Sequence, residues 1–445
     1  MKPRNLYITI LILTLLAALS CNQDPIFYII SKETAPLKPL IEGTPTNMVI
    51  FNRMYPNPDY PDLTEPGYPD PNVPGHFKSV PILYVASGNR LYWYAKSNLG
   101  EGESAWNSGE YKIPQPGGMI SGLAATSTHL YALCRNSSNL NTVLRRIGPT
   151  PSHTNWEVIP SSDSHLQTIF ADPAQDRLFA GTINSILFLT SNSSLQLLKD
   201  LSPMISVEQI SMLSGVIYDE VNDLYLLSTG RSGIFQVLTS DLSTADLAGG
   251  IPDPLAVQQL TETNNPNENN NNRIIAGMIK LESNPAAFFA IERVGGYFYT
   301  IDADAGTFSR IEYTGDLTGW MATGKDATGA IALWKDYLNP DTQLVVFGVQ
   351  DPSTTSYAHG YVEFKLNSDG SLNTGSARHD PGKLISVLDN DRYSATIGKY
   401  PINHLFQAPD TIDDEMTFFA STQNSGLWSY RNRVGSGGWQ WNAEN

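Results

Sequence analysis

The sequence predicts an all-β protein, and three features carry this prediction. Of its 445 residues, 41% are hydrophobic and 16% are charged, which is too apolar for a disordered chain and too weakly charged for a long coiled coil. Its 35 Gly and 29 Pro residues favour many short elements separated by turns. Short apolar runs with alternating aromatic residues recur along the chain, which is typical of strands.

Charge and cysteine content exclude several classes of function. Lys and Arg number 28 against 44 Asp and Glu, and the resulting net charge of −16 argues against a nucleic-acid partner. Two Cys and seven His are too few and too scattered for a disulfide framework or a zinc module. No His pair has the spacing of a metal site, so we expect no metal and no cofactor.

The first 20 residues have the pattern of a secretory signal. Lys2 and Arg4 precede an apolar run over residues 6–19. This run of about 14 residues is shorter than the roughly 20 that cross a bilayer as a helix. Small residues then precede Cys21, as at the cleavage site of an exported protein.

The segment Ala18–Cys21 resembles a bacterial lipobox. Ala18 occupies the position where Leu is usual, a departure similar to the relaxed lipoboxes of spirochaetes. The resemblance implies that Cys21 is lipidated, and two or three acyl chains would anchor the protein stably in the cell envelope, at the outer membrane or a periplasmic face. The alternative is a simple secretory signal that happens to end near a cysteine.

Two proline-rich segments follow. Residues 21–45 are interpreted as the lipidated Cys and an extended tether. Residues 52–74 are denser in Pro, and because each Pro removes a hydrogen-bond donor, this segment is predicted to be a surface loop rather than a central strand. A proline-rich recognition peptide is the alternative.

One hairpin pattern recurs seven times from about residue 46 onward. An apolar strand ends in a small polar turn, and a second strand with aromatic residues follows, at spacings of roughly 46 to 74 residues. Another apolar strand precedes each hairpin, and a fourth, outer strand is expected in most units. The seven hairpins are Ile82–Ser87 with Leu91–Tyr94, His129–Leu133 with Val143–Ile147, Arg177–Gly181 with Ile186–Leu189, Asp223–Ser228 with Ile234–Leu238, Ala287–Ile291 with Tyr297–Ile301, Gln343–Phe347 with Tyr361–Phe364, and Met416–Ser421 with Leu427–Tyr430.

Seven four-stranded units predict a seven-bladed β-propeller over residues 46–445. Each sheet would be apolar on both faces and could bury them only against its neighbours. We expect the ring to close by pairing the strand near Met48–Phe51 with the last sheet; a pair of β-sandwiches is the competing fold. The chain resembles loosely repeated extracytoplasmic propellers and, with its lipobox, a spirochaete-type propeller lipoprotein; this resemblance implies no activity.

The turns after the second strand of each unit are the candidate binding face, because in propellers these turns surround one end of the central channel. Arginine presents a planar fork of donors that suits carboxylate or phosphate, so a partial ring of arginines and amides could attract an anionic group. Solvated, unrelated turn residues are the alternative. The candidates are Arg90, Arg135, Asn184, Arg231, Arg293, Gln350, Gln423 and Asn424.

Other motifs favour structural roles. Asp302–Phe308 resembles a calcium loop, but Asp and Gly are common in hairpin turns, and a turn is predicted. The Asn-rich stretch 264–272 is predicted to be a disordered loop insertion. Cys134 lies in an apolar run and is expected to be buried and inert. We assign no catalytic residues.

The sequence therefore favours an envelope-anchored lipoprotein whose propeller is a rigid platform for a protein or glycan partner. Proline- and tyrosine-rich loops near the N-terminus are expected to extend the binding surface. One alternative is a propeller hydrolase or lyase acting on envelope carbohydrate or lactone. The other is a scaffold subunit of an outer-membrane assembly complex.

Overall fold

The computed structural model describes residues 41–444 with gaps. The longer gaps are 95–105, 109–117, 136–141, 150–155, 205–210, 249–255, 264–272, 312–324, 336–342, 351–359, 381–400 and 410–415, and the shorter ones span one to four residues. The signal segment, Cys21 and most of the tether therefore lie outside the described residues, as does the Asn-rich stretch 264–272.

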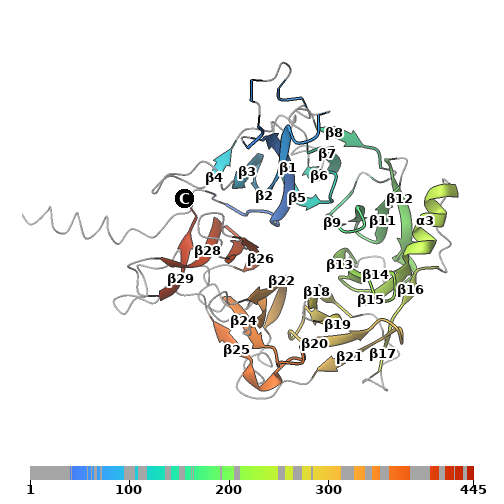
Figure 1. Ribbon diagram of the computed structural model, residues 1–445. Helices are drawn as coiled ribbons and strands as arrows, with labels where there is room; N and C mark the ends of the chain where they lie inside the picture. Colours follow the sequence, from blue (N-terminus) through green and yellow to red (C-terminus); the bar gives the residue numbers. More distant parts are fainter. Residues whose placement is uncertain are drawn as a thin grey trace, which may run out of the picture.

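The described strands form seven sheets arranged around a common axis (Figure 1). Each sheet contains four antiparallel strands that follow one another from the axis outward. The innermost strands are β1 (Val49–Pro56), β5 (Met119–Ala125), β9 (Thr168–Asp172), β13 (Leu213–Asp219), β18 (Ile275–Leu281), β22 (Asp326–Lys335) and β26 (Ile402–Pro409). The second strands are β2 (Phe77–Ser87), β6 (Leu130–Arg135), β10 (Arg177–Gly181), β14 (Leu224–Thr229), β19 (Asn284–Glu292), β23 (Gln343–Gln350) and β27 (Met416–Thr422).

The third and fourth strands complete each sheet. The third strands are β3 (Arg90–Tyr94), β7 (Thr142–Ile147), β11 (Ser185–Leu189), β15 (Ile234–Leu238), β20 (Phe298–Asp302), β24 (Gly360–Lys365) and β28 (Gly426–Arg433). The outermost are β4 (Trp106–Ser108), β8 (Glu157–Ile159), β12 (Leu195–Asp200), β16 (Gln258–Gln259), β21 (Thr307–Ile311), β25 (Arg378–Asp380) and β29 (Gly438–Ala443). The short strand β17 (Thr261–Glu262) adds to β21 in parallel, and the helix α3 (Thr239–Ala248) and the 3₁₀ turns η2 (Ser202–Met204) and η4 (Thr374–Ser376) lie between strands. The prediction of a propeller-like all-β fold is confirmed, and every predicted hairpin corresponds to a second and a third strand.

The apolar core lies between sheets. In one cluster, Tyr84 of the first sheet packs with Leu123 and Trp156 of the second, and in another Val346 of the sixth packs with Trp428 of the seventh. A further cluster joins Phe419 of the last sheet to Val85 of the first. Each sheet thus buries both apolar faces against its neighbours, as the apolar strands predict.

The expected pairing of Met48–Phe51 with the last sheet is wrong. Strand β1 pairs with β2 in the first sheet, and the last sheet takes all four of its strands from residues 402–443. β1 is the innermost strand of its sheet, and the first and last sheets meet face to face through side chains and through the chain just before β1. There the backbone N–H of Leu427 donates to the carbonyl of Ile41 (3.1 Å), and that of Gly426 donates to Gly43 (3.0 Å).

A repeated irregularity occurs near the start of several inner strands. The pairing register shifts between Ile120 and Gly122 in β5, between Leu213 and Gly215 in β13, and between Ile275 and Gly277 in β18. A Cβ atom on Gly277 would lie 2.7 Å from the carbonyl oxygen of Gly329 in the next sheet. Glycine is therefore needed at this position because two backbones approach closely.

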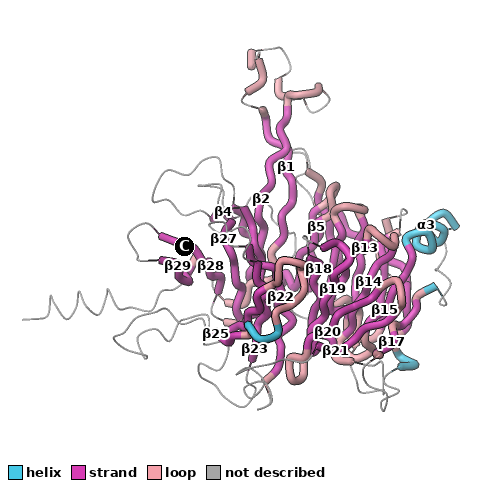
Figure 2. Tube along the Cα trace, turned by 60° about the horizontal axis from the view of Figure 1, so that its bottom comes forward, coloured by secondary structure: helices cyan, strands magenta, loops and turns pink. Residues whose placement is uncertain are grey.

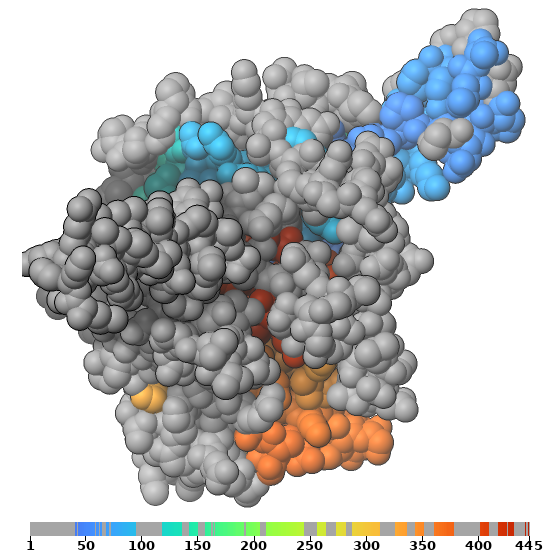
Figure 3. All heavy atoms as spheres, turned by 90° about the vertical axis from the view of Figure 1, so that its left-hand side faces the viewer, coloured from blue at the N-terminus to red at the C-terminus, as the bar shows by residue number. Residues whose placement is uncertain are grey.

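The prediction of a loop over residues 52–74 is wrong in its first part. Strand β1 continues to Pro56 and pairs with β2 from Phe77, so the two strands form a long hairpin that projects from one end of the ring (Figures 2 and 3). Pro56 is the first proline of the run and ends the strand. The base of the hairpin is also held by the neighbouring sheet, since Met54 N donates to Pro149 O (2.9 Å). We call residues 52–80 the arm, and residues 57–76 its tip.

Candidate functional site

The turns between second and third strands lie together at one end of the ring. The backbone of each turn is hydrogen-bonded to the segment where an inner strand begins: Ile120 N donates to Gly88 O (2.8 Å), Ser211 N to Ile183 O (2.7 Å) and Ala327 N to Arg293 O (2.7 Å). Because the inner strands surround the axis, these bonds place the turns around the axis at one end of the ring (Figure 1). We call this end the turn face.

The structure brings all eight predicted residues to the turn face. The side chains of two of them are held by hydrogen bonds within the protein. Asn184 donates its side-chain N–H to Ser202 Oγ (2.7 Å), and Asn424 accepts a hydrogen bond from Thr44 Oγ1 (3.2 Å), so both amides support the fold. Gln350 is half-buried at the end of β23, and Gln423 is exposed.

The four arginines are less engaged with the protein. Arg90, Arg135 and Arg293 are exposed, and Arg231 is half-buried. An acidic residue accompanies one of them: burial raises the pKa of Asp326, and the nearby guanidinium of Arg293 opposes that shift. The exposed guanidinium groups can therefore contact an anionic group from outside the ring.

The arm starts from the opposite end of the ring, which corrects the expectation that it extends the arginine surface. The turn at Gly88–Arg90 follows one end of β2, whereas the arm tip precedes the other end. The 11 residues of β2 span roughly 35 Å at about 3.3 Å per residue. The protein thus offers two separate surfaces rather than one.

The arm tip has a small core of its own. The rings of Tyr60 and Tyr68 stack with centroids 5.6 Å apart, and the His76 ring packs edge-on against Tyr60 at 4.3 Å. Tyr68 Oη donates to Asn57 O (2.6 Å), and His76 Nδ1 accepts a hydrogen bond from Asp70 N (3.1 Å). These contacts hold the proline-rich tip in a defined shape, and Leu63 of the same tip is 50% exposed.

A buried ionic cluster lies in the fifth sheet, next to the turn face, and sequence analysis missed it. Arg273 Nε contacts Glu262 Oε2 at 2.7 Å, and Tyr299 Oη donates to Glu292 Oε2 at 2.7 Å. Burial raises the pKa of Glu292, although Tyr299 and Arg273 oppose the shift. Glu262, Glu292 and Tyr299 lie on three different strands and Arg273 precedes a fourth, so only strand pairing brings them together. Their burial fits a role in fastening β17 and the start of β18 to the sheet.

A cavity of about 290 Å³ lies between the inner strands β22 and β26. His404, Phe406 and Lys335 are among the residues that line it. His404 Nδ1 accepts a hydrogen bond from Met48 N (3.1 Å), and burial lowers the pKa of His404 to about 4. The imidazole is therefore neutral at physiological pH, with its proton on Nε2. His404 lies in the seventh sheet and Glu292 in the fifth, so these two groups with shifted pKa values do not form an acid–base pair.

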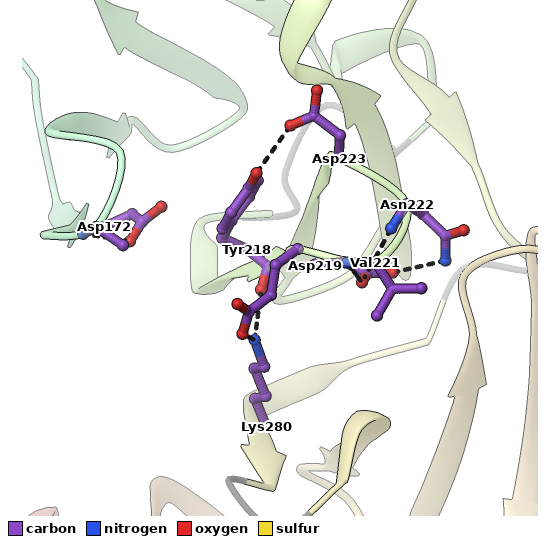
Figure 4. A network of polar contacts seen from close by, with 9 residues as sticks. Asp172, Tyr218, Asp219, Val221, Asn222, Asp223 and Lys280 are labelled. Carbon is purple, nitrogen blue, oxygen red and sulfur yellow. Dashed lines mark hydrogen bonds and ion pairs between the residues drawn. The ribbon is translucent and has the colours of Figure 1, made fainter.

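Side chains join neighbouring sheets at the end opposite to the turn face (Figure 4). Within the fourth sheet, Tyr218 Oη donates to Asp223 Oδ1 (2.8 Å), which raises the pKa of Tyr218 to about 12. Lys280 of the fifth sheet forms an ion pair with Glu220 of the fourth. The turn between β13 and β14 thus has a structural role.

The remaining motifs have structural roles where they are described. The predicted turn after Asp302 is confirmed, since Asp302 Oδ1 accepts from Ala305 N (3.0 Å). Cys134 is buried as predicted, and burial raises its pKa to about 11. Within the described ranges, no group of three or more His, Cys, Asp or Glu residues could hold a metal ion. No helix in that part of the chain is long and apolar enough to cross a membrane.

Comparison with known proteins adds little. No protein-family model and no curated protein matches the sequence. Among solved structures, the extracellular domain of a hybrid two-component system from B. thetaiotaomicron matches with a TM-score of 0.43 at 11% identity, over 79% of this chain and 37% of that one. A chain of a mitotic checkpoint complex matches with a TM-score of 0.46 at 10% identity, over 90% of this chain and 95% of that one. At these scores neither likeness carries an argument about this protein.

Proposed function

We propose that this protein is an envelope-anchored lipoprotein of the spirochaete-like type, in which a seven-bladed propeller is a rigid platform for a protein or glycan partner. The signal-like residues 1–20 and the lipobox-like segment before Cys21 support the anchor. The seven inter-sheet clusters, one of which joins the last sheet to the first, support a closed ring of seven blades.

The arm carries the proposal of a binding role. A hairpin that stands clear of the ring contributes little to the core, yet its tip has three packed rings and several internal hydrogen bonds. A tip held in one shape loses little conformational freedom on binding, so its structure favours recognition. The arginines of the turn face form a second candidate surface.

Binding accounts for these features better than catalysis does. A catalytic propeller would gather carboxylates and histidines with shifted pKa values at the mouth of the channel. Here Glu292 is buried in the fifth sheet, where its carboxylate accepts a hydrogen bond from Tyr299. His404 lies in the seventh sheet, where its Nδ1 accepts a hydrogen bond from Met48 N.

Crosslinking in intact cells tests this function. A photoreactive residue replacing Leu63 at the arm tip should give a defined crosslinked product, as should one replacing Ile183 if the turn face also binds. Val221 is 62% exposed on the turn between β13 and β14 and provides the matched control position. Equal, diffuse crosslinking at all three positions would contradict a binding platform.

The arginine surface is tested separately. Arg90, Arg135, Arg231 and Arg293 are replaced together with Ala, and partner recovery from envelope extract is measured. Unchanged recovery by this variant, together with loss of recovery by Leu63→Asp, would assign the partner to the arm.

A further inference from the structure

The chain enters the ring at the turn face. Ile41 O and Gly43 O accept hydrogen bonds from Leu427 and Gly426, directly after the last turn of that face. Thr44 Oγ1 donates to Asn424 in the same turn, at 3.2 Å. The first described residue, Ile41, therefore lies at the turn-face end of the ring.

The arm points the other way. Strand β2 runs from Phe77 beside the tip to Ser87 beside the turn face, and Pro45 pairs with Ser87. The tip is thus separated from the point where the chain enters by the whole length of β2, roughly 35 Å. Figure 2 shows the arm projecting beyond the ends of the other inner strands.

The length of the predicted tether favours one orientation of the ring relative to the lipid. About 20 residues separate Cys21 from Ile41, and they reach roughly 70 Å when fully extended but about 25 Å on average as a flexible chain. To bring the arm tip to the lipid, the tether would have to pass the rim of the ring and the length of the arm, close to full extension. Bringing the turn face to the lipid requires no extension.

The charges on the two ends agree with this geometry. Arg90, Arg135 and Arg293 are exposed on the turn face, accompanied by Asp200 and the half-buried Asp326. Among its described residues the tip carries Asp70 and Asp59, the latter in an exposed ion pair with Lys78 (3.5 Å), and residues 54–77 contain no Lys or Arg. Arginine is attracted to anionic lipid headgroups, whereas the acidic tip is repelled by them.

We infer that the turn face is the membrane-facing surface of the anchored protein, with its exposed arginines next to anionic headgroups, and that the arm tip points away from the lipid toward partners. This inference rests on the proposed anchor at Cys21, and it decides between the two candidate surfaces of the proposed function.

Fluorescence quenching on vesicles tests the orientation. The lipidated full chain is reconstituted on vesicles of phosphatidylcholine and phosphatidylglycerol that contain a headgroup-labelled quencher. A dye is attached to Ile183→Cys on the turn face, to Leu63→Cys on the tip, or to Val221→Cys at the arm end of the ring, in a Cys134→Ala background. We expect several-fold stronger quenching at position 183 than at position 63, with position 221 also weak.

Flotation of the same vesicles separates the two possible failures. If the protein does not float with the vesicles, the anchor of the proposed function is wrong. If it floats and the dye at position 63 is quenched as strongly as the dye at position 183, the orientation is wrong.

A charge variant tests the headgroup contact. Arg90→Gln, Arg135→Gln and Arg293→Gln together should reduce quenching at position 183 at least two-fold on anionic vesicles, with no change on pure phosphatidylcholine. Lys78→Gln with Arg146→Gln, which removes positive charge away from the turn face, should have no effect. Equal quenching of the triple variant and the parent on anionic vesicles would overturn the contact.

Discussion

The two ends of the ring are held together in different ways. At the turn face, neighbouring sheets are joined by backbone hydrogen bonds, such as Ala327 N to Arg293 O. At the arm end, several joints are made by side chains, since Thr128 Oγ1 donates to Asp176 (2.7 Å) and Tyr225 Oη donates to Asp172 (2.9 Å), beside the backbone bond from Met54 to Pro149. Backbone bonds do not depend on residue type, so the exposed arginines of the turn face can serve recognition. Asp172 and Asp176 at the arm end instead hold neighbouring sheets together.

Adding a side chain at Gly277 should have the largest effect on stability. Gly277→Ala places a Cβ 2.7 Å from a backbone oxygen of the next sheet, where neither strand can move easily. We expect a loss of about 2–4 kcal/mol in the free energy of unfolding, measured by denaturant titration. Gly122→Ala is the matched control, since its closest contact would be an ordinary 3.5 Å. Similar losses in both variants would contradict the close approach of the inner strands.

Acid should weaken the junction between the first and last sheets through His404. Burial lowers its pKa to about 4, against about 6.5 for an unfolded chain. Between these values the unfolded chain binds more protons, so stability is full above pH 6.5 and falls as the pH drops toward 4. Because His404 is partly exposed, we expect a loss on the order of 1–2 kcal/mol.

The variant His404→Gln isolates this effect. Its amide oxygen can still accept the hydrogen bond from Met48 N, but it does not titrate. Unfolding measured from pH 7 to pH 4 should therefore be less pH-dependent in the variant, and identical slopes would remove His404 from the account.

Removing a side-chain hydrogen bond between sheets at the arm end should lower the free energy of unfolding by a smaller amount. Asp176 accepts hydrogen bonds from Ser127 Oγ and from the backbone and hydroxyl of Thr128. Although partial burial opposes the shift, these bonds lower the pKa of Asp176, so its contribution is present above the unfolded value near 3.9 and is lost as the pH falls through the folded pKa. Asp176→Asn keeps a residue that tolerates its positive φ of 53°. We expect a loss of about 1 kcal/mol by thermal unfolding.

The arginines of the turn face should have the smallest effect on stability. Replacing Arg90, Arg135 and Arg293 with Ala should change the free energy of unfolding by less than about 0.5 kcal/mol, because exposed side chains outside the core contribute little. A loss comparable to that of Asp176→Asn would show that this face is held by side chains as well, and the contrast between the two ends would disappear.

The parts of this fold that local pattern determines could be predicted from the sequence. Alternating apolar residues, as in Leu91–Tyr94, identify a strand whose two faces are buried, and the spacing of such hairpins predicts repeated sheets. The repeats Ile120-Ser-Gly122, Leu213-Ser-Gly215 and Ile275-Ala-Gly277 were also visible in principle. Aligning the inner strands would have revealed them and the close approach that they permit.

Features that depend on distant residues could not be predicted. The length of the arm could not be predicted, because the strand up to Pro56 is defined by its pairing with β2 and not by the local proline-rich pattern. The closure of the ring was missed because Ile41 and Gly43 make their bonds to residues more than 380 positions away. The cluster of Glu262, Arg273 and Glu292 forms only when β17 reaches the fifth sheet. The position of the turns was predicted, whereas their chemical role stays a prediction.

A crosslink across the closure tests the central claim most directly. Thr44→Cys and Asn424→Cys are combined, since the native side-chain oxygens lie 3.2 Å apart. The closed ring predicts that mild oxidation of the folded protein links these two cysteines in most molecules, as mass spectrometry of the joined peptides would show. Failure to form the link in folded protein, while the cysteines remain reactive toward maleimide, would contradict both the closure and the position at which the chain enters the ring.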